Sequence, residues 1–240
     1  MTAIPVENRT AEIEAFLDRE HAATTYEEKV ALARDVLAWA LERHGDKLTI
    51  ASSMGDEILL HLAGTTAPGF DVFFLDTGYH FAETLGTRDA YEVMLPLKIR
   101  TILPKETVER QDVRFGPRLH DRNPDLCCRM RKVAPLNAAL VGYDAWVTGV
   151  RRADAATRAE SELIEWDAKR SMIKVNPIVG FSHDEADRYA GENGVFMNPL
   201  RELGFASIGC APCTRPVGEG EDPRAGRWAG QNKVECGLHI

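Results

Sequence analysis

The chain has 240 residues, enough to bury a full hydrophobic core, and its 44% hydrophobic and 28% charged content is ordinary for a globular protein. Its formal net charge of −8 argues against a general nucleic-acid or membrane-surface binder, because both of those partners are polyanionic. Residues 1–20 contain no apolar signal core, and no later run reaches the roughly 18 apolar residues of a membrane span, so a cytoplasmic protein is expected.

The predicted elements alternate between helices and short apolar strands. Residues 25–44 indicate an amphipathic helix, with Thr25 and Glu28 as a capping box and Gly45 as its end. Further helices are predicted over 57–63 and 80–93, and a helical stretch over 126–141 is interrupted by Pro135. Strands are predicted over 48–52, 71–76, 97–103 and 145–150, and another within 171–178.

This alternation predicts an α/β fold with a parallel sheet and helices on both faces. Ligands of such folds bind beyond the carboxyl ends of the strands, so the turns 52–56, 75–80 and 148–158 are the pocket candidates. We expect one domain. Within it, residues 1–45 form a helical N-terminal segment, 46–195 the α/β core, and 196–240 an irregular C-terminal segment rich in Gly, Pro and Arg.

Five cysteines carry the clearest chemical signal. Cys127 and Cys128 are adjacent, and Cys210 and Cys213 form a C-x-x-C pair, so the fold can bring two thiolate pairs to one metal site. The alternative is that they are small apolar core residues. Zinc and an iron–sulfur cluster both suit four thiolates, but adjacent cysteines converge awkwardly on one small ion, which favours a cluster with separate irons. Cys236 is left over.

Cations gather near the cysteines and the predicted turns, although the chain is acidic. The planar fork of arginine suits phosphate and sulfate oxygens, so converging clusters indicate a small anionic substrate. A positive surround would also favour the thiolate form of a nearby cysteine. The alternative is a set of solvated surface charges. The clusters are Arg129, Arg131 and Lys132, then Arg151, Arg152 and Arg158, then Arg215, Arg224 and Arg227.

The turn ASSMGDE (51–57) places small hydroxyl residues and a glycine between a strand and a helix. Backbone N–H groups at such a turn can hold phosphate. The turn matches neither the Walker pattern nor the dinucleotide fingerprint, so by itself it indicates little.

Several segments together resemble the assimilatory adenylyl-sulfate reductases, thioredoxin-dependent enzymes that reduce adenosine 5′-phosphosulfate (APS). The matches run in order from about residue 48 to residue 239. They are LDTGYHFAETL (75–85), CCRMRKVAPL (127–136), TGVRRADAATR (148–158), GCAPCTRPV (209–217), RAGRW (224–228) and ECGLH (235–239).

The resemblance implies an adenine-nucleotide α-hydrolase-like (Rossmann-like) fold and one 4Fe-4S cluster held by Cys127, Cys128, Cys210 and Cys213. It implies that Cys236 is the nucleophile. The thiolate attacks the sulfur of APS and AMP leaves, and thioredoxin then reduces the cysteine S-sulfonate to release sulfite, in sulfate assimilation and cysteine biosynthesis. A soft nucleophile, neutralised oxygens and a good leaving group are what breaking this S–O bond requires.

The binding residues of the family also carry over by position. Lys132 would bridge cluster and substrate electrostatically, while Arg158, Arg224 and Arg227 would hold phosphate and sulfate. Leu75 and Gly149 would contact adenine through their backbones. The other expected substrate contacts are Ser52, Ser53 and Arg151.

One residue departs from the family pattern and bears on the choice of substrate and activity. Where the family often has Gly after the second serine, this chain has Met54, with Gly55 next, which changes how closely the backbone can approach a substrate. Related reductases that use the 3′-phosphorylated substrate (PAPS) typically lack the four cluster cysteines, so APS is expected and PAPS is the alternative. Two rival functions are an ATP pyrophosphatase-type adenylating enzyme and a non-catalytic, zinc-stabilised binding protein.

Cys236 lies near the end of a Gly-rich run from Gly218 to Gly237. An arm that must meet first the substrate and then thioredoxin is expected to be mobile. His239, three residues later, would either tune the thiolate or merely finish the chain. No nucleic-acid or membrane partner is expected, and the sequence leaves the oligomeric state open, a homo-oligomer included.

Overall fold

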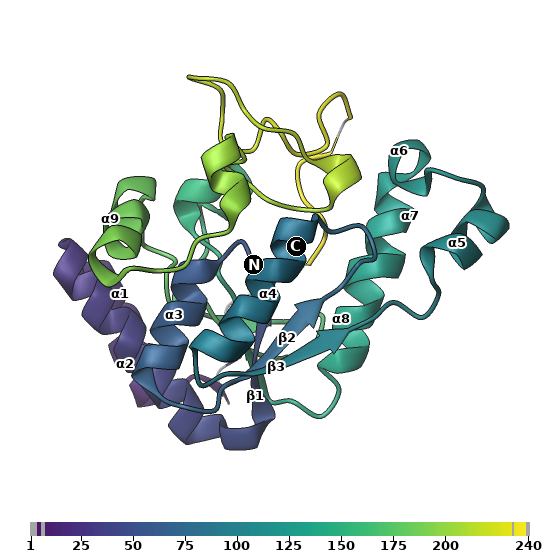
Figure 1. Ribbon diagram of the computed structural model, residues 1–240. Helices are drawn as coiled ribbons and strands as arrows, with labels where there is room; N and C mark the ends of the chain where they lie inside the picture. Colours follow the sequence, from purple (N-terminus) through teal and green to yellow (C-terminus); the bar gives the residue numbers. More distant parts are fainter. Residues whose placement is uncertain (1–3, 6–7, 232, 239–240) are drawn as a thin grey trace.

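A six-stranded sheet forms the centre of the computed structural model, which describes residues 4–5, 8–231 and 233–238 (Figure 1). The strand order is β3-β2-β1-β4-β6-β5. All neighbouring pairs are parallel except β5 and β6, which are antiparallel. The strands are β1 Leu48–Ser52, β2 Asp71–Leu75, β3 Lys98–Ile102, β4 Ala145–Val147, β5 Ile164–Asp167 and β6 Met172–Val175.

Helices connect the strands and cover the sheet. The α-helices are α1 Ala11–Ala22, α2 Tyr26–His44, α3 Glu57–Thr66, α4 Ala82–Met94, α5 Val108–Phe115, α6 Leu119–Arg122, α7 Pro124–Cys128, α8 Ala134–Ala139 and α9 His183–Asn193. A π-helix, η3, spans Arg129–Val133. Short 3-10 helices are η2 Gly45–Lys47, η4 Arg152–Asp154, η5 Ala156–Arg158, η6 Pro199–Leu203 and η7 Ala211–Cys213.

The strands contribute side chains to two separate hydrophobic cores, because successive side chains point to opposite faces of a sheet. In β2, Val72 and Phe74 join the larger core, which includes residues of α1, α2, α3, α4 and α9, while Phe73 and Leu75 face the core beneath α8. In β4, Trp146 likewise belongs to the α8 side. Figure 1 shows α1, α2 and α3 on one side of the sheet and α8 on the other. The predicted α/β fold with helices on both faces is therefore confirmed.

Local sequence signals fix the best-predicted helix. The Thr25 side chain accepts from the backbone N–H of Glu28, and the Glu28 carboxylate reaches back to the backbone N–H of Thr25, which completes the predicted capping box. Gly45 ends α2 with a φ of 52°, a left-handed value that glycine adopts without a steric penalty.

The helix over 124–139 continues past Pro135 instead of being interrupted there. The turn before it is the π-helix η3, and Pro135 lies in the first turn of α8. Because proline has no N–H to donate and its ring crowds the preceding turn, a widened turn accommodates it without ending the helix. The same turn carries Arg131 and Lys132, both buried.

The sheet reverses its direction of growth between β1 and β4. From β1 the chain adds β2 and β3 on one side, and then crosses to place β4 and β6 on the other. The carboxyl ends of β1 and β4 diverge at such a switch point, and this is where open parallel sheets bind ligands.

Within its described residues, the C-terminal segment from residue 196 has no helix or strand beyond the short helices η6 and η7, as its lack of periodicity predicted. Figure 1 shows it lying across the carboxyl ends of the strands. Its mobility and the division of the chain at residues 45 and 195 stay predictions. Among the residues that the structure describes, no helix has both the length and the apolar character needed to cross a membrane.

Candidate active site

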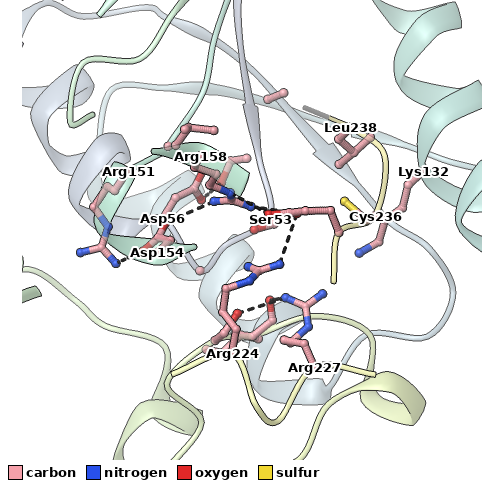
Figure 2. Close-up of a pocket in the computed structure, with 18 of the residues that line it drawn as sticks. Ser53, Asp56, Lys132, Arg151, Asp154, Arg158, Arg224, Arg227, Cys236 and Leu238 are labelled. Atoms are coloured by element: carbon pink, nitrogen blue, oxygen red, sulfur yellow. Dashed lines mark hydrogen bonds and ion pairs between the residues drawn. The ribbon is translucent and has the colours of Figure 1, made fainter. Parts of the chain in front are cut away.

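A large cavity of about 1140 Å³, counting its open mouth, lies at the carboxyl ends of β1, β2 and β4. The sheet supplies its floor and the C-terminal segment its opposite wall (Figure 2). It brings together every described residue that the sequence analysis assigned to catalysis or substrate binding. These are Ser52, Ser53, Leu75, Lys132, Gly149, Arg151, Arg158, Arg224, Arg227 and Cys236. His239 lies outside the described residues.

The turn after β1 is held by its own side chains. The Ser52 hydroxyl accepts from the backbone N–H of Met54 at 3.0 Å and donates to the Asp56 carboxylate at 2.6 Å. Ser53 is left exposed to the cavity. Met54, which replaces the expected glycine, has a φ of 56°, the left-handed value that glycine would adopt freely, and its side chain is fully buried. The substitution therefore keeps the turn but strains its backbone.

Asp56 stands at the start of α3 and faces the large cavity. Burial raises the pKa of its carboxyl to about 6, although the Ser52 hydroxyl opposes the shift. Glu57, the next residue, adds a repulsion that favours the protonated form. The carboxyl consequently titrates near neutral pH beside the site.

Gly149 follows β4 and passes very close to α3. A Cβ at this position would lie 2.6 Å from the Asp56 Cβ, so only glycine fits. Across the cavity, the Leu75 carbonyl at the end of β2 accepts a hydrogen bond from His80 Nε2 at 2.9 Å. Burial lowers the pKa of His80 to about 4, which keeps its ring neutral.

Cationic side chains reach the large cavity from several elements. Figure 2 shows Arg151 and Arg158 on one side, Lys132 on another, and Arg224 and Arg227 rising from the C-terminal segment. Some of this charge is balanced locally: Arg151 Nη2 lies 2.8 Å from the Asp154 carboxylate. Arg227 donates through Nη1 to Ile208 O at 3.1 Å, but its buried Nε has no partner within the described residues.

Four thiols line a second cavity, the thiol cavity, of about 370 Å³ when the space open to solvent is counted. They come from α7, which supplies Cys127 and Cys128, and from the segment around η7, which supplies Cys210 and Cys213. Burial and the three neighbouring thiols raise the pKa of Cys127 to about 12, while burial and the neighbouring thiols Cys210 and Cys128 raise that of Cys213 to about 11. The two sequence pairs therefore meet in space.

The donors around the thiol cavity suit a sulfur-rich group. The Thr77 hydroxyl lies 3.2 Å from Cys210 Sγ, and the buried indole N–H of Trp228 has no partner among the described residues. Among the residues that the structure describes, no three or more His, Cys, Asp or Glu side chains are grouped so that they could hold a metal ion. Four thiols around one cavity are the donor set that an iron–sulfur cluster requires, and the cluster itself stays a prediction.

The two cavities share a dividing wall made of Lys132, Arg227 and Trp228, which line both. Burial disfavours the ammonium of Lys132, but the negative charge available on Cys210 and Cys236 outweighs it and raises the pKa of Lys132. Lys132 therefore stays charged between the thiol cavity and the large cavity, as the expected electrostatic bridge requires.

Some cations counted in the sequence lie elsewhere. Arg131 lines the thiol cavity and donates to the Thr77 carbonyl and to Gln111, while Arg152 pairs with Glu20. Arg215 pairs with Glu221 at 2.9 Å, and Arg129 is exposed. The clusters of cations in the sequence therefore predict more positive charges at the large cavity than the structure places there, because neighbouring residues on a turn point in different directions.

Other lining residues were not singled out from the sequence: Asp56, His80, Arg201, Trp228 and Leu238. Asp56 and His80 belong to turns that were named as pocket candidates, so the strand-end position was the available signal. Arg201 pairs with Glu57 at 3.0 Å, a contact across 144 residues that no local pattern indicates.

Comparison with known proteins gives consistent matches. The model of the phosphoadenosine phosphosulfate reductase domain family matches residues 47–216. An adenosine 5′-phosphosulfate reductase of Streptomyces coelicolor is 51% identical over 239 residues, covering 100% of both chains. One from Mycolicibacterium smegmatis is 49% identical, covering 88% of this chain and 89% of its own.

Solved structures agree on the fold. A phosphoadenylyl-sulfate (PAPS) reductase from Candida auris, in a phosphate complex, superposes with a TM-score of 0.70 at 25% identity, covering 90% of this chain and 100% of its own. The FMN adenylyltransferase of Candida glabrata, at 12% identity and a TM-score of 0.59, covers 85% of this chain and 72% of its own and shares the fold alone. These neighbours confirm the expected adenine-nucleotide α-hydrolase-like fold. With its matched domain, its relatives near 50% identity and this fold, the chain belongs to the phosphoadenosine phosphosulfate reductase domain family.

Proposed function

We propose that this chain is an adenylyl-sulfate reductase, which converts adenosine 5′-phosphosulfate to sulfite and AMP in sulfate assimilation and cysteine biosynthesis. One observation carries the proposal: a free thiol near the chain end, Cys236, opens into the same cavity as Lys132, Arg224 and Arg227. A nucleophile surrounded by cations suits attack on an anionic sulfur centre. Relatives at 46–51% identity carry the same activity in their names.

In the first step the Cys236 thiolate attacks the sulfur of the sulfate group. An S–S bond forms, the bond between that sulfur and the bridging oxygen breaks, and AMP leaves with the electron pair. Lys132 and Arg227 neutralise the sulfate oxygens and so reduce the repulsion between two anions. Gly149 and Leu75 present backbone groups to the nucleotide, and glycine at 149 lets this backbone pack against Asp56 at the start of α3.

In the second step a dithiol protein of the thioredoxin class reduces the S-sulfonate. One of its thiolates attacks Cys236 Sγ, and sulfite leaves with the electron pair of the S–S bond. The second thiol then attacks the mixed disulfide, which frees Cys236 and leaves the reductant oxidised by two electrons. The Cys236 thiol is partly exposed, so a reductant can reach it when the arm moves outward.

The thiol cavity is proposed to hold one 4Fe-4S cluster on Cys127, Cys128, Cys210 and Cys213. When bound, the cluster would supply charge beside Lys132 and tie α7 to the segment around η7. Lys132 then holds its ammonium in the dividing wall, where it faces the substrate on one side and the cluster thiolates on the other.

We also propose a cytoplasmic location. None of the five cysteines is in a disulfide, which suits a reducing compartment. The same compartment supplies dithiol reductants of the thioredoxin class.

PAPS reduction is the second candidate, because the solved PAPS reductase from Candida auris superposes on this chain with a TM-score of 0.70. Parallel assays with APS and PAPS decide between them. The proposal expects sulfite release from APS at a much higher kcat/KM, and equal or greater efficiency with PAPS would assign the second candidate instead.

The nucleophile is tested by intact mass after incubation with APS and no reductant. The wild-type chain should gain the mass of one sulfonate, and Cys236→Ser should gain none while keeping its visible absorbance and unfolding midpoint. A sulfonate on the Cys236→Ser variant would show that another group is the nucleophile.

A further inference from the structure

Glu235, the residue before Cys236, is the most completely bound side chain of the terminal arm, residues 233–238. Its side chain is only 4% exposed. One oxygen accepts from Arg158 Nε at 2.9 Å and from the Thr157 hydroxyl at 3.2 Å. The other accepts from Arg158 Nη2 at 3.2 Å and lies 3.2 Å from Arg224 Nη2. A buried carboxylate with this many partners is held firmly in place, because burying its charge without these hydrogen bonds and ion pairs would be very unfavourable.

The same contacts occupy the guanidinium of Arg158. Its Nε and Nη2 both donate to Glu235, and its Nη1 donates to the Asp154 carboxylate at 3.2 Å. Every nitrogen of the Arg158 guanidinium therefore already has a carboxylate partner while the arm is docked. The pKa of Glu235 reflects this arrangement: burial alone would raise it, but Arg158 and Arg224 hold it below its usual range.

Anchors of different kinds lie on the two sides of Cys236. On the amino side are Glu235 and the Val234 carbonyl, which accepts from Arg224 Nη2 at 2.9 Å, and further back Lys233, which pairs with the Asp125 carboxylate. On the carboxyl side Leu238 packs against the core beneath α8, after Gly237 turns the chain with a φ of 81°. Val234 itself is 68% exposed, so its side chain contributes little to docking. Within the described arm, Glu235 thus supplies the charged anchor next to the nucleophile.

We propose that Glu235 is a positioning residue, whose carboxylate docks the terminal arm on Arg158 and Arg224 and thereby holds the Cys236 thiol at the large cavity. Arg158 then acts on the reaction through the arm, while Lys132 and Arg227 face the substrate anion. The consequence for turnover rests on the proposed function, whereas the docking itself does not.

Docking is measured without any substrate, by the rate at which iodoacetamide alkylates Cys236 in the intact, metal-loaded protein. Peptide mass spectrometry follows Cys236 separately from the other four cysteines. Glu235→Gln keeps the shape but removes the charge, so we expect alkylation at least about tenfold faster than in the wild type. That factor corresponds to about 1.4 kcal/mol of lost docking free energy. Glu219→Gln, an exposed glutamate of the same C-terminal segment, is the matched control and should alkylate at the wild-type rate.

Arg158→Lys gives a second, independent test of the same contact. Lysine keeps the positive charge but cannot make the two parallel hydrogen bonds to Glu235, so alkylation should again accelerate. Both variants are compared at equal visible absorbance, and their thermal unfolding midpoints are recorded. If either folded variant alkylates at the wild-type rate, Glu235 does not dock the arm and the proposal is overturned.

The effect on chemistry distinguishes positioning from a merely structural role. In single turnover with APS, Glu235→Gln should form the S-sulfonate about tenfold more slowly, while the Kd for AMP stays within about twofold of the wild type. Glu235→Asp keeps the charge and should recover part of the rate. A rise in the AMP Kd with an unchanged rate would overturn positioning, because it would place Glu235 in nucleotide binding. If wild-type protein forms no S-sulfonate, the proposed function fails, and the alkylation rates still decide the role of Glu235.

Discussion

The buried carboxyl of Asp56 predicts how the free energy of unfolding depends on pH. Its pKa rises from 3.8 to about 6 on folding because burial disfavours the carboxylate. Unfolded chains therefore lose the proton from about pH 4 upward, while the folded protein retains it until about pH 6. Stability contributed by this group consequently falls as the pH rises through that window and is lowest above it.

The magnitude follows from the two pKa values. A rise from 3.8 to about 6 corresponds to about 3 kcal/mol above neutral pH, an upper bound because water in the open cavity screens the charge. Asp56→Asn removes the charge and still accepts the hydrogen bond from the Ser52 hydroxyl, which is 2.6 Å long. We therefore expect the variant to be more stable than the wild type above neutral pH, by up to this amount.

Urea unfolding followed by tryptophan fluorescence at a series of pH values measures the difference. For a slope of about 3 kcal/mol per molar, the midpoint of Asp56→Asn should lie up to about 1 M higher near neutral pH and coincide with the wild type at about pH 4. Asp18→Asn, on an exposed position of α1, controls for the loss of one carboxylate. A stability difference that does not change with pH, or a less stable Asp56→Asn at about pH 8, would refute the reasoning.

Two further substitutions test the backbone around the large cavity. Gly149→Ala should cost about 1–3 kcal/mol of unfolding free energy and weaken AMP binding, because its Cβ would meet the Asp56 Cβ at 2.6 Å. Gly86→Ala, where a Cβ meets nothing within 4 Å, should be neutral or slightly stabilising in the same denaturant assay, and equal costs at both positions would contradict the argument. Met54→Gly should relieve about 1 kcal/mol of left-handed strain but lose a fully buried side chain worth about 2–5 kcal/mol. A calorimetric midpoint that rises instead would show that strain outweighs packing.

The sequence predicts the core elements well where burial dominates. The strand 48–52 and the helix after Thr25 agree with β1 and α2, because a short run of mostly apolar residues and a capping box are local signals. The strand Ile164–Asp167 was not predicted. It is a short antiparallel edge strand with the polar residues Glu165 and Asp167, and its pairing with β6 compensates for its weak local pattern.

The residues of the candidate site likewise include some that the sequence predicted and some that it did not. The described residues that the resemblance assigned to catalysis, substrate binding or the cluster, such as Cys236 and Lys132, line the two cavities, because the resemblance carries their positions. The partner of Arg158 was not foreseen. Its contact with Glu235 spans 77 residues, and it arises only because the C-terminal segment crosses the strand ends. Arg158 was expected to bind a substrate anion, but a carboxylate of the protein can accept the same pair of hydrogen bonds from its guanidinium.

The π-helix over Arg129–Val133 has a consequence for comparing this chain with its relatives. Such a turn holds one residue more than an α-helical turn, yet the flanking helix continues on both sides. A relative that lacks the extra residue therefore needs an alignment gap within 129–133. Each residue of an α-helix turns by about 100°, so a gap opened elsewhere would pair Lys132 with a residue on another face of the helix. Evolutionary comparisons of the dividing wall thus depend on where that single gap is placed.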